Sequence, residues 1–436
     1  MSMILALKVI LFTHVVLLGY TWGGYQILLA MLATTRKRSQ SRSGILPDAV
    51  PPSTISPAAM QSFGAGNHQP STSPPHISII IAAFNEESVI AERIQNLKNL
   101  NYPPEKITVY IGCDGCTDTT ASIAKNATAD DPHFHILDFK QNRGKVSVLR
   151  KLVAKAADNP DASGTLLVFS DANTMFAPDA LLKLSAHFVD ENIGGVCGRL
   201  AFVSKDETSE NPAEEGAYWK LETKLKTWES TLGSCLGANG AIYAIRPQLF
   251  WQEIPENTIV DDLVIGMKVR EQGFRMIYDP TAIATEILPE VGDEWTRRVR
   301  IGTGDYQAAV LCKACLHPRF GWFAWSFWSH KILRWLTPHM AMITIIASYA
   351  LTAISLLNKD FSITALLTYT VAIGITALLA AGHIGNMIQT RQNRLTKICA
   401  ICNHFVTMHA ALFIGFIRFC NGNMQGTWKR TPRKKI

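Results

Sequence analysis

Four long apolar segments, one at the start of the chain and three near its end, most constrain how this sequence can fold. They run over residues 4–32, 332–357, 361–388 and 398–419. As a helix, an apolar run of about 20 residues crosses the ~30 Å hydrocarbon core of a bilayer. With 47% apolar and 18% charged residues among 436, the chain is too apolar for a purely soluble protein. The sequence therefore predicts an integral membrane protein.

Basic residues beside these segments indicate the orientation. Arg36, Lys37 and Arg38 follow the first apolar segment, and further basic residues end the chain. Because basic flanks remain in the cytosol, we predict that residues 4–33 are a retained transmembrane anchor and that the next domain is cytosolic, at a plasma (inner) membrane. The net charge of +7 lies mostly in such flanks. We therefore expect a lipid bilayer, and no nucleic acid, as a partner.

Composition divides the rest of the chain into five segments. Residues 34–76 are rich in Ser and Pro and predict a flexible linker. Residues 77–292 alternate short apolar runs with helical patterns. Residues 293–331 mix arginines with aromatic residues, as interfacial amphipathic helices do. Residues 332–419 form a transmembrane region, and residues 420–436 form a basic tail.

The last apolar segment raises a question of topology. If all three C-terminal segments crossed the bilayer, the basic tail would lie outside the cytosol, against the usual placement of basic residues. Residues 398–419 also contain Asn403, His404, His409 and Arg418. Two spans followed by one interfacial helix agree better with the charge rule.

Residues 77–292 alternate apolar runs with helical patterns throughout. Continuous apolar runs predict strands buried on both faces, as in a parallel sheet covered by helices. Strands are expected at 77–83, 107–113, 134–138, 165–171, 241–245 and 275–278, and helices at 86–100, 117–126, 145–157, 178–189, 214–232 and 262–272. This pattern predicts a doubly wound α/β core, in which ligands bind beyond the carboxyl ends of the strands.

Polar motifs follow three of the predicted strands. Asn85 and Glu86 follow the first, Asp114 follows the second, and Asp171 with Asn173 lies at the end of the fourth. Each motif alone is typical of a helix cap or a turn. Three of them at one edge of a sheet predict a shared ligand site.

With these motifs the chain resembles the family 2 glycosyltransferases, in particular the membrane-integral members related to cellulose, hyaluronan and poly-N-acetylglucosamine synthases. The resemblance covers about residues 77–307. It implies a GT-A type catalytic domain and inverting transfer of a sugar from a nucleotide-sugar, a UDP-sugar by family likeness, to a growing polysaccharide. Transfer of a single sugar to a lipid acceptor and a catalytically inactive nucleotide-binding scaffold are the alternatives.

The resemblance assigns the nucleotide to the first two motifs. Asp114 would hydrogen-bond the base, which the backbone near Ala83, Asn85 and Glu86 would frame. Lys145 would reach the diphosphate as a point charge, although a solvated lysine at a helix start is the alternative.

The same likeness places a metal site at the third motif. Asp171 and Asn173 take the place of an Asp-x-Asp motif that holds Mg²⁺ or Mn²⁺. Asn173 departs from the pattern, because it offers a neutral amide oxygen where hard cations prefer a charged one. Asp171 would then contribute more of the metal affinity.

Two further segments correspond to the reacting end of the acceptor. Asp262 is our choice for the general base that accepts the proton of the acceptor hydroxyl, with Asp261 as the fallback. A helix cap would explain one of these carboxylates equally well. Asn239 and Gly240, in the small-residue turn 237–241, would lie under the acceptor.

Residues 297–301 align with the Gln-x-x-Arg-Trp motif of processive family members. Arg300 keeps the arginine that suits a pyrophosphate leaving group, and Arg297 would meet the acceptor in place of the glutamine. Ile301 replaces the tryptophan that would stack on the acceptor sugar, which weakens the case for long-chain processivity. A basic interfacial helix on anionic lipid is the alternative.

The nine cysteines include three Cys-x-x-Cys pairs, the spacing from which zinc ribbons are built. One pair lies in the nucleotide loop and another in an apolar membrane segment, so the two pairs are poorly placed to bind one zinc ion together. We interpret these cysteines as small buried residues and expect no structural disulfide.

Overall fold

The computed structural model describes residues 3–43, 73–158, 165–203, 212–287, 294–388 and 393–424. Most of the predicted linker, residues 44–72, and the end of the basic tail, residues 425–436, lie outside these ranges. The chain divides into two compact units, and each is described by itself. The sheet unit comprises residues 30–293 and 307–326, and the helical unit comprises mainly residues 1–29, 294–306 and 327–423.

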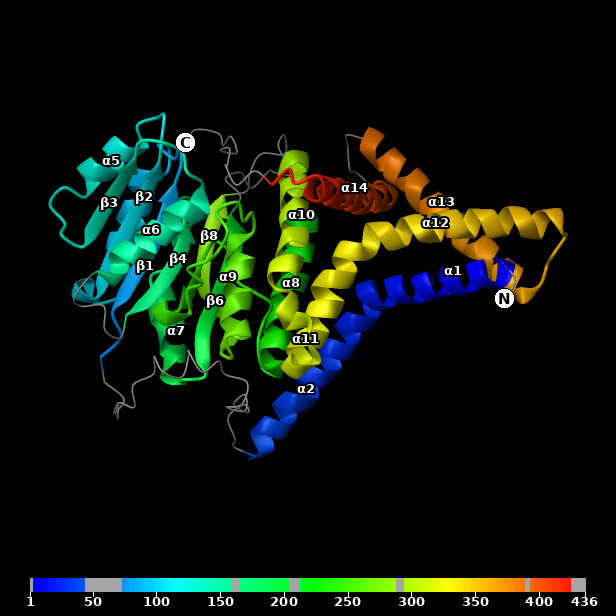
Figure 1. Cartoon of the computed structure of the whole chain (residues 1–436), viewed down its shortest axis with the longest axis horizontal. Helices are drawn as coiled ribbons and strands as arrows, with labels where there is room; N and C mark the ends of the chain where they lie inside the picture. The colour runs from blue at the N-terminus through cyan, green and yellow to red at the C-terminus, as the bar shows by residue number, and fades with distance from the viewer. Residues whose placement is uncertain are drawn as a thin grey trace. The chain divides into compact units, whose positions relative to one another are not determined.

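An eight-stranded sheet forms the core of the sheet unit (Figure 1), with strand order β3-β2-β1-β4-β7-β6-β8-β5. The strands are β1 (Ile77–Ala83), β2 (Ile107–Asp114), β3 (Phe134–Phe139), β4 (Leu166–Asp171), β5 (Met175–Phe176), β6 (Ile193–Val203), β7 (Tyr243–Ile245) and β8 (Arg275–Ile287). Because β1 to β4 are all parallel, the carboxyl ends of β1, β2 and β4 meet at one edge of the sheet.

The predicted α/β class is confirmed, but the prediction of a parallel sheet throughout is wrong. β7 runs antiparallel to both β4 and β6. All three residues of β7 are buried, and a short run buried on both faces carries no signal of direction. Strand β6 was not expected from the sequence, because Gly194, Gly195 and Gly198 interrupt its apolar run. The two-residue strand β5 was not expected either.

Helices cover both faces of the sheet. They are α4 (Ile90–Lys98), α5 (Thr120–Ala127), α6 (Lys145–Ala157), α7 (Ala180–Ala186), α8 (Pro212–Leu232) and α9 (Asp261–Glu271). Alternate residues of β1, such as Ile79 and Ile81, share one core cluster with Ile94 of α4. Fully burying one such side chain contributes about 1.5–3 kcal/mol. On the other face α6 packs against β1 and β2.

The helical unit contains most of the apolar helices. Its elements are α1 (Met3–Gly19), a π-helical turn (Tyr20–Gly24), the start of α2 (Tyr25–Ser43), most of α10 (Glu294–Leu311), α12 (Leu333–Leu357), α13 (Ile363–Met387) and α14 (Arg394–Cys420). Within this unit α1 packs against α12, and α13 packs against both α12 and α14.

Four helical runs in the described residues are long and apolar enough to cross a membrane: Met3–Lys37, Trp322–Leu357, Ile363–Met387 and Arg394–Cys420. They coincide with the four apolar segments of the sequence. The mean hydropathy of the last run is 1.6, whereas that of the other three runs is 2.0 or 2.1. Its assignment as an interfacial helix stays a prediction.

Two expected boundaries fall inside continuous helices. Helix α2 extends to Ser43, although we expected the linker to begin at residue 34. Residues 34–43 contain no Pro or Gly, so nothing in them ends a helix, and the Pro-rich composition begins only at Pro47. Helix α11 (Trp322–Ser326) continues through a π-helical segment (Phe327–Ile332) into α12, without the break that we expected near residue 331.

The packing of α9 depends on a glycine. A Cβ atom added at Gly266 would lie 2.7 Å from the Ala238 backbone nitrogen and 2.8 Å from the Gly237 carbonyl carbon. Both contacts are to backbone, and Gly237 has a φ of 70°, so neither residue yields easily. Helix α9 and the turn 237–241 are therefore held together by a close backbone approach.

We expect Gly266→Ala to lower the stability of the sheet unit by about 1–3 kcal/mol, the usual cost of overpacking. Thermal unfolding in detergent would show this as a lower Tm. Gly374→Ala is the matched control, because an added Cβ there would meet nothing within 4 Å. Equal Tm values for the two variants would contradict the close approach.

Candidate active site

The loops that follow β1 and β2 are tied to each other by polar side chains. Asn85, with a φ of 55°, accepts a hydrogen bond from the Thr117 backbone N–H at 2.8 Å and donates to the Thr117 hydroxyl at 3.0 Å. The Glu86 N–H donates to the Thr120 hydroxyl at 2.8 Å. The Cys116 thiol donates to the Ala83 carbonyl at 3.6 Å. The first two predicted motifs therefore form one structured edge.

Asp114 holds the turn that leads into α6. Its side chain is fully buried, and its two carboxylate oxygens accept hydrogen bonds from the backbone N–H groups of Arg143 at 2.7 Å and Gly144 at 2.9 Å. Gly144 has a φ of 87°, which a residue with a Cβ rarely adopts. Asp114 thus sets the direction in which Lys145 enters the site, a contact that the sequence did not reveal. Its contact with a base stays a prediction.

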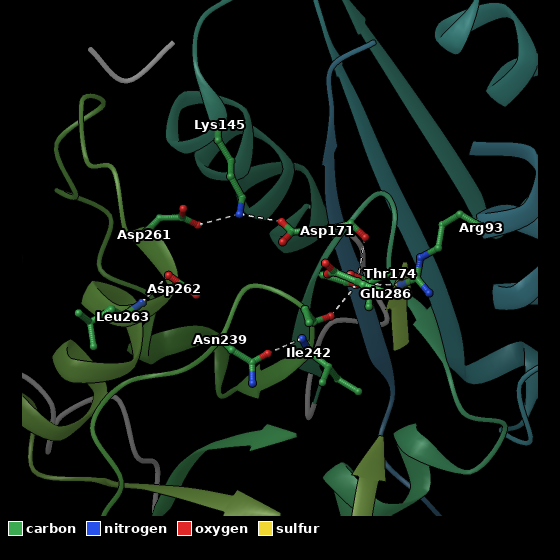
Figure 2. Close-up of polar contacts among 12 residues, drawn as sticks. Arg93, Lys145, Asp171, Thr174, Asn239, Ile242, Asp261, Asp262, Leu263 and Glu286 are labelled. Atoms are coloured by element: carbon green, nitrogen blue, oxygen red, sulfur yellow. Dashed lines mark hydrogen bonds and ion pairs between the residues drawn. The ribbon is translucent and has the colours of Figure 1, made fainter. Parts of the chain in front are cut away.

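Lys145 connects two of the predicted site carboxylates, as Figure 2 shows. Its Nζ atom lies 2.8 Å from Asp171 Oδ1 and 3.4 Å from Asp261 Oδ2. Burial alone would lower the pKa of Lys145, but the attraction of Asp171, Asp261 and Asp262 outweighs burial and raises it. The ammonium group is therefore charged at any physiological pH. Residues from β4, α6 and α9 meet at this point.

The two adjacent carboxylates at the start of α9 differ in surroundings. Asp261 is buried, and burial raises the pKa of its carboxyl to about 6; the Lys145 ammonium opposes this rise, and the charges of Asp262 and Asp171 add to it. Asp262 is only partly buried, and its Oδ1 accepts a hydrogen bond from the Leu263 N–H at 2.8 Å. Of the pair, Asp262 is the one that an incoming ligand can reach.

The turn 237–241 contacts the same carboxylate that Lys145 binds. A Cβ atom at Gly240 would lie 2.8 Å from Asp171 Oδ2, so a larger residue at this position would displace the carboxylate. The Asn239 amide group donates to the Gly198 carbonyl at 2.8 Å and accepts from the Ile242 N–H at 3.2 Å, which fixes the turn. Asp171 therefore lies between the predicted donor side and the predicted acceptor side.

The predicted metal ligands Asp171 and Asn173 end β4 and begin the loop after it, and both are partly exposed. No cluster of three or more His, Cys, Asp or Glu suited to a metal ion occurs among the described residues. Mg²⁺ is commonly held by only one or two carboxylates together with the phosphates of a substrate. One carboxylate and one amide oxygen fit that kind of shared site, and do not fit a metal site built from protein ligands alone.

Arg297 and Arg300 lie on α10, in the part of this helix that belongs to the helical unit. Arg297 forms an ion pair with Glu294 of the same helix at 3.4 Å, and Arg300 is exposed. Their assigned roles toward the acceptor and the pyrophosphate stay predictions. All nine cysteines are free thiols.

One buried charge beside the site was not singled out from the sequence. Arg93 lies on α4 and is fully buried, and its guanidinium donates to the Ser170 hydroxyl next to Asp171. The signal was present, because Ile90, Ile94 and Leu97 define the apolar face of this helix and Arg93 shares it.

Part of the chain matches a known protein family. Residues 78–251, which include β1 to β4 and the turn 237–241, match the family model "Glycosyl transferase family 2". This part of the chain is therefore similar to the family 2 glycosyltransferases.

Two curated proteins are similar to about half of this chain. An N-acetylglucosaminyltransferase of Rhizobium leguminosarum bv. viciae is 25% identical over 236 residues, which are 51% of this chain and 54% of that protein. A poly-beta-1,6-N-acetyl-D-glucosamine synthase of Staphylococcus aureus (strain COL) is 25% identical over 247 residues, 54% of this chain and 55% of that protein. The chain thus spans about half the length of these relatives.

A solved structure confirms the fold over a longer stretch. The mannosyltransferase PcManGT from Pyrobaculum calidifontis, in complex with GDP-Man and Mn²⁺, superimposes with a TM-score of 0.61 at 19% identity. The match covers 95% of this chain and 99% of that chain. The predicted GT-A type α/β fold is therefore confirmed.

The raised pKa of Asp261 makes a prediction about stability. The folded state holds the Asp261 proton up to about pH 6, whereas an unfolded carboxyl releases it near 3.8. The stability that comes from the protonated carboxyl is therefore complete below pH ~4 and is lost as the pH rises to about 6. We expect the Tm of the wild type minus that of Asp261→Asn to fall across this window, and the corresponding difference in the free energy of unfolding to fall by at most about 1.4 kcal/mol per pH unit. A constant or rising difference between pH 4 and 7 would contradict the assignment.

Proposed function

We propose that this chain is a membrane-bound inverting glycosyltransferase that transfers a sugar from a UDP-sugar to a growing polysaccharide, at the cytosolic face of a plasma (inner) membrane. The observation that carries the proposal is the Lys145 ammonium, which lies 2.8 Å from Asp171 and 3.4 Å from Asp261. This cluster stands at the carboxyl edge of the parallel strands, where α/β sheets bind ligands. It also lies within or beside the part of the chain that matches the family 2 model.

The donor diphosphate fits the cationic side of this cluster. Lys145 carries a charge that a phosphate oxygen can accept in place of a carboxylate. A divalent cation, Mg²⁺ or Mn²⁺, would be held by Asp171 and Asn173 together with phosphate oxygens, and when bound it would stabilise the negative charge of the leaving nucleotide. The Mn²⁺ and GDP-Man in the PcManGT complex support this division of roles.

The acceptor side requires a base. In an inverting transfer the acceptor hydroxyl oxygen attacks the anomeric carbon on the face opposite the diphosphate, the bond to the diphosphate breaks, and the hydroxyl proton passes to a carboxylate. Asp262 suits this role better than Asp261, because Asp261 is buried and pairs with Lys145 while Asp262 is partly exposed.

A transfer assay tests the function. We expect purified protein in lipid, with Mn²⁺ or Mg²⁺, to transfer labelled sugar from at least one of a panel of UDP-sugars and GDP-sugars. Asp262→Asn should lower kcat by about 10²–10⁴, the usual contribution of a general base. Glu271→Gln is the matched control, because Glu271 ends the same helix and pairs with Lys268 at 2.8 Å. Unchanged activity in Asp262→Asn would remove the base assignment, and no transfer from any donor would remove the function.

The length of the product separates polymer synthesis from a single transfer. The two curated relatives are named as an N-acetylglucosaminyltransferase and a polysaccharide synthase, which favours a polymer. Ile301, where processive members carry a tryptophan, favours a short product. We expect a ladder of products on gel separation of the reaction. A lipid that gains one sugar and no more would establish the alternative function.

A further inference from the structure

A buried arginine lies behind the donor side of the candidate site. Arg93 has no exposed surface, and its guanidinium carbon lies 4.2 Å from the centre of the Phe176 ring. One terminal nitrogen donates to Asn96 Oδ1 at 2.8 Å, and the other donates to the Ser170 hydroxyl at 2.9 Å. Nothing in the roles assigned so far requires a full positive charge at this depth.

The two acceptors of Arg93 each hold a different part of the site. Asn96 binds the backbone of β5, the strand after Asp171 and Asn173. Its amide group donates to the Phe176 carbonyl and its oxygen accepts from the Phe176 N–H, both at 2.9 Å. Ser170 donates from its hydroxyl to the Ala241 carbonyl at 2.9 Å. One guanidinium therefore connects residues 171–176, which carry Asp171 and Asn173, to the turn that carries Asn239 and Gly240.

The charge of Arg93 is balanced by carboxylates on the site side (Figure 2). Burial lowers the pKa of Arg93 to about 9, while the attraction of Asp171 and Glu286 opposes this change. The guanidinium therefore remains charged near neutral pH. Glu286 in turn accepts a hydrogen bond from the Thr174 hydroxyl at 2.6 Å, which ties the same loop to β8. The loop after β4 is thus held from two directions.

We propose that Arg93 is a positioning residue, which sets the distance between the donor loop 171–176 and the acceptor turn 237–241 through Asn96 and Ser170. This inference rests on the proposed function, because it assumes that Asp171 holds a cation and a nucleotide diphosphate. Buried side chains that orient ligand-binding residues commonly change ligand affinity or activity by about 10- to 100-fold when they are removed. Arg93 would act in this way without touching donor or acceptor.

Arg246, which is half-buried, provides a control for the loss of an arginine that donates to neighbouring residues and lies over an aromatic ring. It donates to the carbonyls of Ile193 and Phe188, both at 2.9 Å, and lies 5.4 Å from the Phe188 ring. It follows Ile245, which pairs with Leu167 near the start of β4, so it lies at the opposite end of that strand from Asp171. Arg93→Met and Arg246→Met both remove a hydrogen-bonded guanidinium that lies over an aromatic ring, but only Arg93 is fully buried and contacts the site.

The first measurement is the binding of UDP or GDP in the presence of Mn²⁺, by calorimetry on the full chain in lipid, at a temperature where both variants are folded. We expect Arg93→Met to raise the Kd and the half-saturating Mn²⁺ concentration by about 10- to 100-fold. Arg246→Met should leave both values within about twofold of the wild type. Arg93→Lys keeps the charge and one hydrogen bond at most, and should recover part of the loss.

A double-mutant cycle tests the route. If Arg93 acts through Ser170, the fold-changes in Kd caused by Arg93→Met and Ser170→Ala should multiply to more than the fold-change of the double variant. For Arg93→Met and Arg246→Met, the product of the two fold-changes should equal that of the double variant. Nucleotide affinity that is unchanged in folded Arg93→Met would overturn the proposal and leave Arg93 a residue of the core. Wild type that binds nucleotide but transfers no sugar would refute the proposed function alone, and wild type that binds no nucleotide would refute both.

Discussion

One ammonium group makes the candidate site possible. Asp171, Asp261 and Asp262 are brought together from two distant parts of the chain, and like charges in a partly buried position repel each other. Lys145 lies between Asp171 and Asp261 and offsets that repulsion. Breaking a buried ion pair leaves an uncompensated charge, yet such a pair adds little stability compared with well-packed apolar residues. Four charged groups at the rim of an apolar sheet are therefore better explained by a charged ligand than by the fold.

The surrounding motif residues act largely on the backbone. The side chains of Asp114, Asn85 and Asn239 each accept a hydrogen bond from backbone N–H groups of a neighbouring turn. These hydrogen bonds fix the orientation of the side chains and of the loops that they join. These residues had been assigned to ligand contact on resemblance alone. The structure shows that they also build the frame that directs Lys145 and Asp171.

Much of the fold followed from the sequence, because long local patterns are reliable. The bounds of β1 and α6 agree with the expected ranges, since an uninterrupted apolar run and a clear helical period leave little choice. The direction of β7 could not be predicted, because a strand of three buried residues has no pattern that distinguishes parallel from antiparallel pairing. Strand β6 was not predicted, because its glycines interrupt the apolar run. Among the candidate site residues, local motifs singled out Asp171, Asp262 and Lys145, whose roles stay predictions. The contact of Lys145 with Asp261 could not be foreseen, because it joins two helices far apart in the sequence.

The charges of the site also explain how a departure from the family pattern can be tolerated. Asp171, Asp261 and Asp262 together carry more negative charge than the single ammonium of Lys145 offsets, so the cluster attracts a cation before any ligand binds. Mg²⁺ is commonly held by one or two carboxylates together with substrate phosphates, so the diphosphate oxygens would supply the charged ligands that Asn173 does not. The amide oxygen of Asn173 still offers a neutral ligand. The neutral residue at the metal motif is therefore consistent with a working site.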